Sequence, residues 1–173
     1  MRYDRAMTPV IREATPQEHA EAGRVTAEAY REFVAPGETA WETYLTHIAD
    51  VASRAERTRV MIAVQDGRIV GSATLELQDR VDPKDDGPLA PGEAHIRMLG
   101  VDPDARGGGV ARALMTACEE MARAAGKTVM TLHTTSRMRA AQRMYASMGY
   151  VREEDRVFPD GFVLLSYSKR LGG

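Results

Sequence analysis

The chain has 173 residues, 43% of them hydrophobic, which suffices for one domain with a sizeable core and is too short for two. Its 23 Lys and Arg against 25 Asp and Glu give a net charge of -2, so no basic field favours nucleic acid or an anionic membrane. No apolar stretch approaches the ~20 residues of a membrane helix, residues 1–20 lack the apolar core of a secretory leader, and a single cysteine, Cys118, excludes an internal disulfide framework. We therefore predict a cytoplasmic protein without a membrane or nucleic-acid partner.

The first third of the chain predicts a short strand and two helices. Residues 1–8 have no periodic pattern and are predicted to be a loose tail, with a single domain over residues 9–173. After a short extended run at 10–12, Thr15-Pro16-Gln17-Glu18 supplies an N-cap, a first-turn Pro and a Glu three residues beyond the cap, which predicts a helix to about residue 30 or 33. Pro36-Gly37 interrupts it. Apolar residues then recur at helical spacing from Trp41 to Ala55 and predict a second amphipathic helix.

The rest of the chain predicts strands interrupted by two helices. Runs rich in β-branched residues at 60–64 and 69–77 flank Asp66-Gly67, a strong signal for an antiparallel hairpin. Residues 78–92 contain Pro and Gly punctuation and predict a long exposed loop. Further strands are expected at 93–101, 128–134, 150–158 and 162–169, and helices at 108–125 and 136–148. This order of elements predicts an α/β protein with a mixed sheet and helices on its faces.

The segment from Val101 to Ala111, VDPDARGGGVA, lies between a predicted strand and a predicted helix. Glycines at a helix N-terminus let consecutive backbone N–H groups converge on an anion, and the helix dipole adds a favourable potential, so a pyrophosphate is a suitable ligand. The alternative is that the glycines only form a tight turn. A Walker loop is excluded because no Gly-Lys-Ser/Thr ending follows, and the dinucleotide pattern fails because Arg112 stands where Gly or Ala is required.

Arg106-x-x-Gly109-x-Ala111 resembles the R/Q-x-x-G-x-G/A element of the GNAT superfamily of N-acetyltransferases. The strand ending Leu99-Gly100-Val101, the Asp-Pro turn after it, and Ala141-x-x-x-Tyr145-x-x-x-Gly149-Tyr150 are similar to the same family's pattern at its usual spacing. The motifs cover residues 93–151, and the order of elements extends the resemblance over nearly the whole chain. The resemblance implies a mixed, mostly antiparallel central sheet of about six to seven strands with about four helices on its faces. It also implies an acyltransferase that uses acetyl-CoA as donor and no metal.

The resemblance also implies how coenzyme A binds. In this family the fourth strand separates from the fifth near a bulge, and the pantetheine arm adds there like an extra strand, which assigns backbone contacts to Leu99 and Val101. The loop amides that would hold the pyrophosphate are those of Arg106, Gly107, Gly108, Gly109, Val110 and Ala111. On the following helix, Leu114 and Cys118 share a face with Val110 and are predicted to be core, with Cys118 an inert buried thiol.

Tyr145 is the predicted general acid. Positions 138, 141, 145 and 148 share a face of the predicted helix, so Tyr145 points toward the sheet. In the family a Tyr at this position often protonates the departing coenzyme A thiolate, which would also place it against the cofactor. The alternative is an ordinary core aromatic whose hydroxyl needs one partner. The sequence departs from the family at Met138, where an Asn is common.

An amine that arrives as ammonium must lose a proton before it attacks a thioester, so a base is needed. Many relatives carry a Glu six residues before the strand-ending Val; here that residue is His95, and Glu93 lies on the same nominal face of the strand. An imidazole titrating near ~6.5 can act directly or through water. The alternatives are that His95 is a hydrogen-bonded strand residue, that Glu93 is a surface charge, or that water takes the proton. The histidine spacing and single cysteine predict no structural zinc site.

The resemblance places the acceptor site among the first two helices, their connecting loop and the last hairpin. Candidate lining residues are Phe33, Trp41 and Tyr44, although helical spacing makes Trp41 and Tyr44 core residues first. Candidate groups for attracting a cationic amine are Asp82, Asp85 and Asp86. The predicted reaction is direct transfer of acetyl from acetyl-CoA to a primary amine of a small molecule in a ternary complex. The alternatives are a protein or peptide N-acetyltransferase and a catalytically weak acetyl-CoA-binding sensor. The sequence does not specify the acceptor and allows a homodimer.

Overall fold

The predicted Asp66-Gly67 hairpin is the local element that begins the sheet. In the computed structural model, which describes residues 8–35 and 37–172, these two residues have φ values of 50° and 73°. Two consecutive positive φ values define a type I′ turn, which matches the twist of the strands it joins. The turn connects β2 (Arg59–Gln65) to β3 (Arg68–Glu76). The predicted tail at 1–8 lies outside the described residues except for Thr8.

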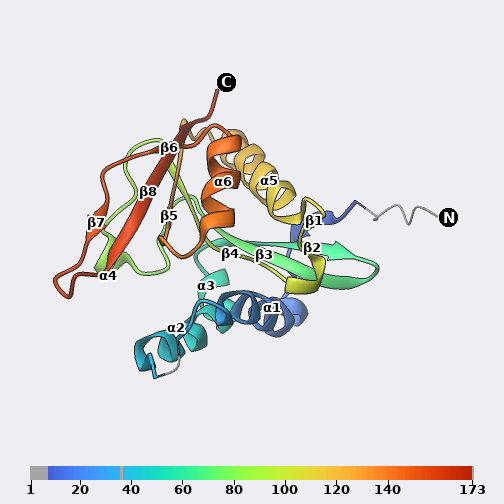
Figure 1. Ribbon diagram of the computed structural model, residues 1–173. Helices are drawn as coiled ribbons and strands as arrows, with labels where there is room; N and C mark the ends of the chain where they lie inside the picture. The colour runs from blue at the N-terminus through green and yellow to red at the C-terminus, as the bar shows by residue number, and fades with distance from the viewer. Residues whose placement is uncertain (1–7, 36, 173) are drawn as a thin grey trace.

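The sheet extends from this hairpin in the order β1-β2-β3-β4-β5-β8-β6, with β7 paired to β8 (Figure 1). The remaining strands are β1 (Val10–Glu13), β4 (Glu93–Val101), β5 (Val129–Thr134), β6 (Val151–Arg152), β7 (Arg156–Val157) and β8 (Val163–Arg170). Among the strand pairs of the described residues, β4–β5 is parallel and the others are antiparallel. The predicted mixed, mostly antiparallel α/β fold is confirmed.

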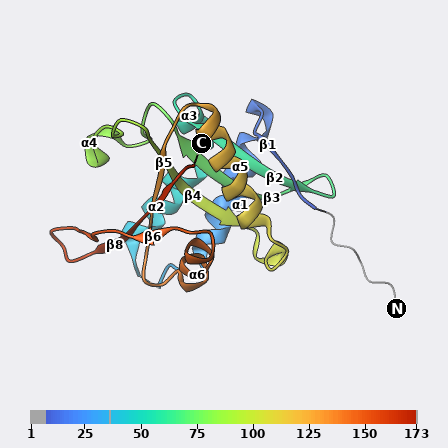
Figure 2. The same ribbon diagram turned by 90° about the horizontal axis from the view of Figure 1, so that it is seen from above.

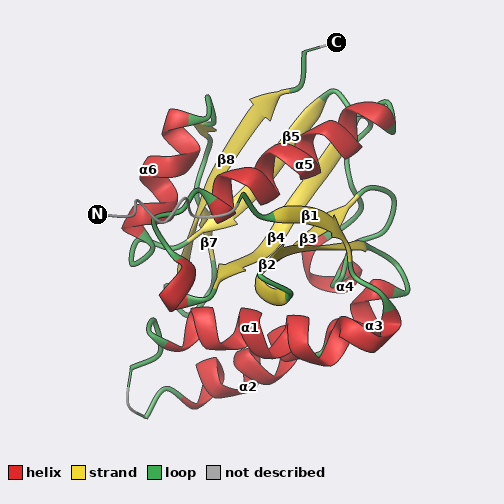
Figure 3. Ribbon diagram, turned by 90° about the vertical axis from the view of Figure 1, so that its right-hand side faces the viewer, coloured by secondary structure: helices red, strands yellow, loops and turns green. Residues whose placement is uncertain are grey.

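Helices cover both faces of the sheet (Figures 1 and 3). On one face lie α1 (His19–Arg31), α2 (Thr39–Ala49) and α3 (Val51–Ala55); on the other lie α5 (Val110–Ala124) and α6 (Arg139–Ser147). Short 3-10 turns at Pro16–Glu18 and Pro103–Ala105 lead toward α1 and α5. As predicted, three residues of α5 are buried in the core: Val110, Leu114 and Cys118. Burial raises the pKa of the Cys118 thiol to about 12.

Four predicted element boundaries are wrong. The helix expected from Trp41 to Ala55 divides at Asp50, whose carboxylate accepts a hydrogen bond from the Ser53 N–H at 3.2 Å and begins α3. The expected loop at 78–92 contains one helical turn, α4 (Pro83–Asp86), and the helix expected at 136–148 begins at Arg139. The strand expected at 150–158 is two short strands, β6 and β7, because three residues between Arg152 and Arg156 lie opposite two residues between Tyr167 and Leu164 of β8. As seen from above, α4 and the turn between β7 and β8 project on the same side (Figure 2).

The parallel pair β4–β5 separates partway along its length. Pairing runs from Glu93 opposite Val129 to Ile96 opposite Leu132 and stops there. Two residues later, Met98 has a φ of 53°, and the register with β3 shifts at the same place. An extra residue in one strand bends it and ends its pairing. The bulge and the separation implied by the resemblance are therefore present, and the opening between the strands leads into the middle of the molecule.

Candidate active site

Two cavities meet at the opening between β4 and β5. The larger cavity, of about 730 Å³, lies among α2, α4, β4 and the turn that joins β7 to β8. The smaller cavity, of about 610 Å³, lies beside the glycine-rich loop and α6. Four residues line both cavities, and we call them the junction: Tyr30, His133, Thr134 and Met138. A molecule in one cavity can therefore meet a molecule in the other at these four side chains.

The glycine-rich loop forms an anion cradle at the start of α5. Gly107 and Gly109 have φ values of 84° and 79°, which glycine adopts at little cost. Within the described residues, the N–H groups of residues 107–112 have no protein acceptor, and a Cβ on Gly107 or Gly109 would meet nothing within 4 Å. Free amides at a helix N-terminus with open space before them fit a pyrophosphate such as that of coenzyme A.

Most of the predicted cofactor residues line the smaller cavity. They are Leu99, Val101, Arg106, Gly107, Gly109, Val110, Ala111 and Tyr145; Gly108 is not among the lining residues. The Arg106 guanidinium is directed elsewhere, since it donates to the carbonyls of Ala29 and Val101 at 3.3 and 3.4 Å and forms an ion pair with Glu32. Arg106 therefore ties the loop to α1 with its side chain. Phe33, expected at the acceptor site, also lines the smaller cavity.

Tyr145 is buried between two other tyrosines and faces the smaller cavity. Its ring lies 5.9 Å from that of Tyr150 and 5.8 Å from that of Tyr167, centroid to centroid, and the residue is 6% exposed. Burial, together with the nearby Tyr167, raises the pKa of Tyr145. The raised pKa keeps the hydroxyl protonated at neutral pH, so its proton is available for a ligand in the smaller cavity.

His95 and Glu93 are joined through the hydroxyl of Thr131. The Thr131 Oγ1–H donates to Glu93 Oε1 at 2.6 Å, so the Nδ1–H of His95 donates to Thr131 Oγ1 at 2.7 Å. This arrangement leaves Nε2 of His95 as the acceptor nitrogen of a neutral ring. His95 is 3% exposed and lines the larger cavity, and its burial lowers its pKa well below the usual value. Glu93 lines neither cavity and also pairs with Arg80 at 3.5 Å.

His133 is a site residue that the sequence analysis missed. Its ring centroid lies 5.1 Å from that of His95, and its Nδ1 is 3.0 Å from Ser166 Oγ. It belongs to the junction, whereas His95 lines only the larger cavity. Burial lowers the pKa of His133, so its ring is neutral near neutral pH. The two imidazoles form a pair of proton-accepting groups beside the place where the cavities meet.

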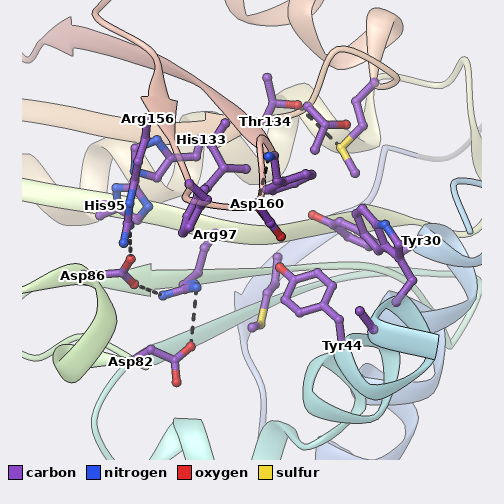
Figure 4. A pocket seen from close by; sticks show the side chains of 18 of the residues that line it. Tyr30, Tyr44, Asp82, Asp86, His95, Arg97, His133, Thr134, Arg156 and Asp160 are labelled. Atoms are coloured by element: carbon purple, nitrogen blue, oxygen red, sulfur yellow. Dashed lines mark hydrogen bonds and ion pairs between the residues drawn. The ribbon is translucent and has the colours of Figure 1, made fainter. Parts of the chain in front are cut away.

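Two acidic residues at the larger cavity, Asp82 and Asp86, are paired with arginines (Figure 4). Arg97 binds Asp86 at 2.9 Å and Asp82 at 3.6 Å, and Asp86 also binds Arg156. Asp82 is also 3.2 Å from the ring of His47. Trp41 and Tyr44 both line this cavity. Tyr44 also packs against the buried cluster of Ala27, Ile48 and Met98, as its helical spacing indicated, whereas Trp41 belongs to no core cluster of the described residues. Asp85 was also expected to attract a cationic amine, and its side chain lies outside the described part of the structure.

The opened mixed sheet beside a helix N-terminus with free amides is the arrangement that the resemblance to N-acetyltransferases implied. A model of the acetyltransferase (GNAT) family matches residues 23–150, more than half of the chain. The protein therefore belongs to the GNAT acetyltransferase family and is an acyltransferase that uses acetyl-CoA, as the resemblance implied. A search of curated proteins found no significant match.

Solved structures with the same fold come from several bacteria. A GCN5-related N-acetyltransferase from Rhodopseudomonas palustris is 24% identical, with a TM-score of 0.73 over 96% of this chain and 98% of that one. The putative acetyltransferase yncA from Salmonella typhimurium, solved with acetyl-CoA, is 19% identical, with a TM-score of 0.67 over 96% and 95%. The ribosomal-protein-S18-alanine N-acetyltransferase from Escherichia coli is 18% identical, with a TM-score of 0.68 over 95% of each chain. At these identities the likeness establishes the fold.

The described residues contain neither a group of side chains arranged to hold a metal ion nor a helix that could cross a membrane. No group of three or more His, Cys, Asp or Glu side chains is arranged to hold a metal ion in that part of the chain. Nor does any described helix have the length and apolar character needed to cross a membrane.

Proposed function

We propose that the protein transfers the acetyl group of acetyl-CoA directly to a primary amine of a small molecule. The observation that carries the proposal is the junction, where a cavity with a pyrophosphate cradle meets a cavity with two neutral histidines. Acetyl-CoA supplies the thioester carbonyl that the amine attacks. Because both ligands can meet at the junction, no covalent acyl-enzyme is required.

Residues of the smaller cavity would bind the donor. The free amides of residues 107–112 would hold the pyrophosphate, and the unpaired edge of β4 at Leu99 and Val101 would pair with the pantetheine. Tyr145 stays protonated and lines the same cavity, so its hydroxyl would donate a proton to the departing thiolate.

The two histidines would remove the proton of the incoming ammonium. His95 keeps Nε2 as its acceptor because Thr131 and Glu93 hold its Nδ1–H, and His133 lies next to it at the junction. In this scheme Glu93 is a positioning residue, acting on His95 through the Thr131 hydroxyl. The proton would be accepted either by His133 at the junction or by His95, directly or through one water.

A small acceptor is supported by the shape of the larger cavity. A volume of about 730 Å³ lies within the range usual for small-molecule sites, ~300–1,000 Å³. The testing experiment is thiol release from acetyl-CoA with a panel of small amines and peptides bearing free N-termini or lysines. We expect turnover with small amines and little with peptides. Preferred turnover of peptides would identify a protein acetyltransferase, and acetyl-CoA binding without transfer to any acceptor would identify a sensor module.

Three predictions concern the whole protein rather than the site. The single domain over residues 9–173, the cytoplasmic location and the homodimer stay predictions.

A further inference from the structure

Half of the aromatic residues of this chain gather at the larger cavity. The sequence contains 6 Tyr, 3 Phe and 1 Trp. Five of these ten line the cavity: Tyr30, Trp41, Tyr44, Phe158 and Phe162. Tyr145, Tyr150 and Tyr167 are buried in the core, where the ring of Tyr145 contacts the other two. Tyr30 and Tyr44 also pack against the buried cluster of Ala27, Ile48 and Met98. Among the described residues, Trp41, Phe158 and Phe162 belong to no core cluster, so these three rings at the cavity are not needed to fill the core.

Four of the five cavity aromatics form a continuous row, which we call the aromatic row. The ring centroids of Tyr44 and Trp41 are 5.6 Å apart, those of Trp41 and Phe162 6.4 Å, and those of Phe162 and Phe158 5.8 Å. The row joins α2 to the turn between β7 and β8, so it assembles only in the folded protein. Phe162 is 40% exposed, and Trp41 and Phe158 are only partly buried. Ring surface left open beside a cavity offers stacking and edge contacts to a flat apolar group.

The charges on the wall of the same cavity balance. Three carboxylates line it, Asp82, Asp86 and Asp160, together with three cations, Lys84, Arg97 and Arg156. Asp86 pairs with both Arg97 and Arg156, and Asp82 pairs with Arg97. Both nearby histidines are held neutral by burial. Both guanidinium groups are therefore engaged by carboxylates, and a carboxylate on a ligand would compete with Asp82 and Asp86 for them.

Two buried polar atoms of residues that line this cavity have no hydrogen-bond partner within the described part of the chain: Thr135 Oγ1 and Arg97 Nε. Thr135 is 7% exposed and follows the junction residue Thr134. A buried hydroxyl without a partner costs free energy that a hydrogen-bonding ligand recovers. In the proposed complex the ammonium group of the ligand would supply that partner to Thr135.

We propose that the acceptor is an arylalkylamine, a primary amine joined by a short chain to an aromatic ring and lacking a carboxylate. The ring would lie on the aromatic row and the ammonium group at the junction, beside His133 and Thr135. This inference rests on the proposed function, because it names the substrate class of that site. An aromatic amino acid fits less well, since its carboxylate would have to displace Asp86 from Arg97 and Arg156.

A matched panel tests the substrate class by turnover. We would compare the kcat/KM values of 2-phenylethylamine, hexylamine, phenylalanine and spermidine at saturating acetyl-CoA. We expect 2-phenylethylamine to exceed the other three by about tenfold or more, a difference of ~1.4 kcal/mol. A kcat/KM for hexylamine or phenylalanine equal to or above that of 2-phenylethylamine would overturn the proposal.

Two substitutions test the aromatic row directly. Trp41→Leu and Phe162→Leu keep an apolar side chain but remove the ring, and each should lower kcat/KM for 2-phenylethylamine by about threefold to tenfold, mainly through KM. The value for hexylamine should change by less than about twofold on the same scale. Val157→Ala is the control, because Val157 is 67% exposed, belongs to β7 and lines neither cavity. Equal losses for both amines would show that the rings only hold the two elements together.

Binding can be measured apart from turnover. Trp41 is the single tryptophan of the chain, so its fluorescence reports on this cavity alone. We expect 2-phenylethylamine to change the Trp41 emission in a saturable way, and hexylamine to require a higher concentration. Binding without acetyl transfer would overturn the proposed function and support the ligand class. Transfer to other amines without a change of Trp41 emission on adding 2-phenylethylamine would overturn the ligand class alone. If neither acetyl transfer nor a change of Trp41 emission is observed, the ligand class and the proposed function are both overturned.

Discussion

At the scale of single residues, the protonation states of three side chains decide what chemistry the site performs. His95 and His133 have lowered pKa values, chiefly through burial, and Tyr145 has a raised one for the same reason. Desolvation disfavours the charged form of each group, so one physical cause gives two proton acceptors and one proton donor at neutral pH. The two histidines that can accept a proton line the larger cavity, where the amine would bind. The tyrosine that can donate a proton lines the smaller cavity, where the thiolate would leave.

Substituting the two histidines separately should identify the base. If His133 accepts the proton, His133→Gln should lower kcat/KM by about 10²-fold or more, with a much smaller loss in His95→Gln. Because the pKa of the base is lowered, wild-type kcat/KM should rise as pH increases through a value below ~6.5 and then follow the ionisation of the amine. The responsible variant should lose the lower limb in a pH profile. Intact limbs in both variants would leave proton removal to water.

Tyr145→Phe separates chemistry from packing. The substitution keeps the ring between Tyr150 and Tyr167 and removes only the hydroxyl, so the free energy of unfolding should change by about 1 kcal/mol or less. If the hydroxyl protonates the thiolate, kcat should fall about 10²-fold while acetyl-CoA binding stays the same. Chemical denaturation, a binding titration and steady-state kinetics check the three parts. Wild-type kcat in this variant would make Tyr145 a core residue only.

At the scale of elements, the glycine-rich loop and the first turn of α5 act together. Gly109→Asp should abolish acetyl-CoA binding, because a carboxylate would lie among the amides that the pyrophosphate needs. Asp tolerates the positive φ of 79° better than most residues, so the fold should persist. Gly109→Asn is the matched control, with the same size and φ tolerance and no charge. Calorimetric titration should show weaker acetyl-CoA binding by the Gly109→Asp protein than by the Gly109→Asn protein. Equal acetyl-CoA affinity of both variants and the wild type would exclude the cradle.

The contact between α1 and α2 depends on Gly23. A Cβ at this position would lie 2.0 Å from the carbonyl oxygen of Ala49, so Gly23→Ala must push the helices apart. Overpacking costs ~1–3 kcal/mol, which exceeds the ~1 kcal/mol that alanine gains in helix propensity. We expect a lower urea midpoint and, because α2 carries Trp41, a larger KM for the acceptor. Gly172→Ala, where a Cβ meets nothing within 4 Å, should leave both unchanged. A stabilised Gly23→Ala protein would contradict this packing.

What could be predicted from the sequence differs between these elements for a physical reason. The Asp66-Gly67 turn and the loop before α5 are set by local backbone preferences, and both are where the pattern indicated. The break at Asp50 was missed because the apolar spacing of α2 continues into α3, and periodicity does not register one residue with a non-helical ψ of 72°. Trp41 and Tyr44 have core spacing, and Tyr44 does pack against a core cluster, but both also line a cavity that spacing alone does not predict.

The missed site residue is a matter of tertiary structure. In the sequence, His133 fits the alternation of a strand like its neighbours, so nothing marks it as a site residue. It lines both cavities only because β5 separates from β4. Likewise, Asp82 and Asp86 read as a solvated acidic loop, while their partners Arg97 and Arg156 are distant in sequence. Local patterns predicted the donor loop well and the acceptor cavity poorly, because the acceptor cavity is built from contacts between the two ends of the chain.

At the scale of the whole molecule, the separation of β4 from β5 creates the site and weakens the sheet. Strands β1–β4 and strands β5, β6 and β8 share only the short parallel ladder from Glu93 to Ile96. Other contacts must therefore hold the two parts of the sheet together. A buried polar cluster supplies one such contact, since Glu119 of α5 accepts from the Lys169 Nζ of β8 at 2.8 Å and from the Tyr150 hydroxyl at 2.9 Å. Helix α5 itself packs on β2, β3 and β4.

Removing the charge of Glu119 should therefore destabilise the whole fold. Glu119 is 3% exposed, and Glu119→Gln would leave the mostly buried Lys169 ammonium without its counter-charge, at a cost of ~3 kcal/mol or more. Arg123→Gln is the control, because Arg123 is 38% exposed and 3.5 Å from Glu119, so its loss should cost ~1 kcal/mol or less. Urea unfolding measures both. Lys169→Met combined with Glu119→Gln should recover part of the loss, since the unpaired charge is then gone. If Glu119→Gln unfolds at the wild-type midpoint, the cluster does not join the two parts of the sheet.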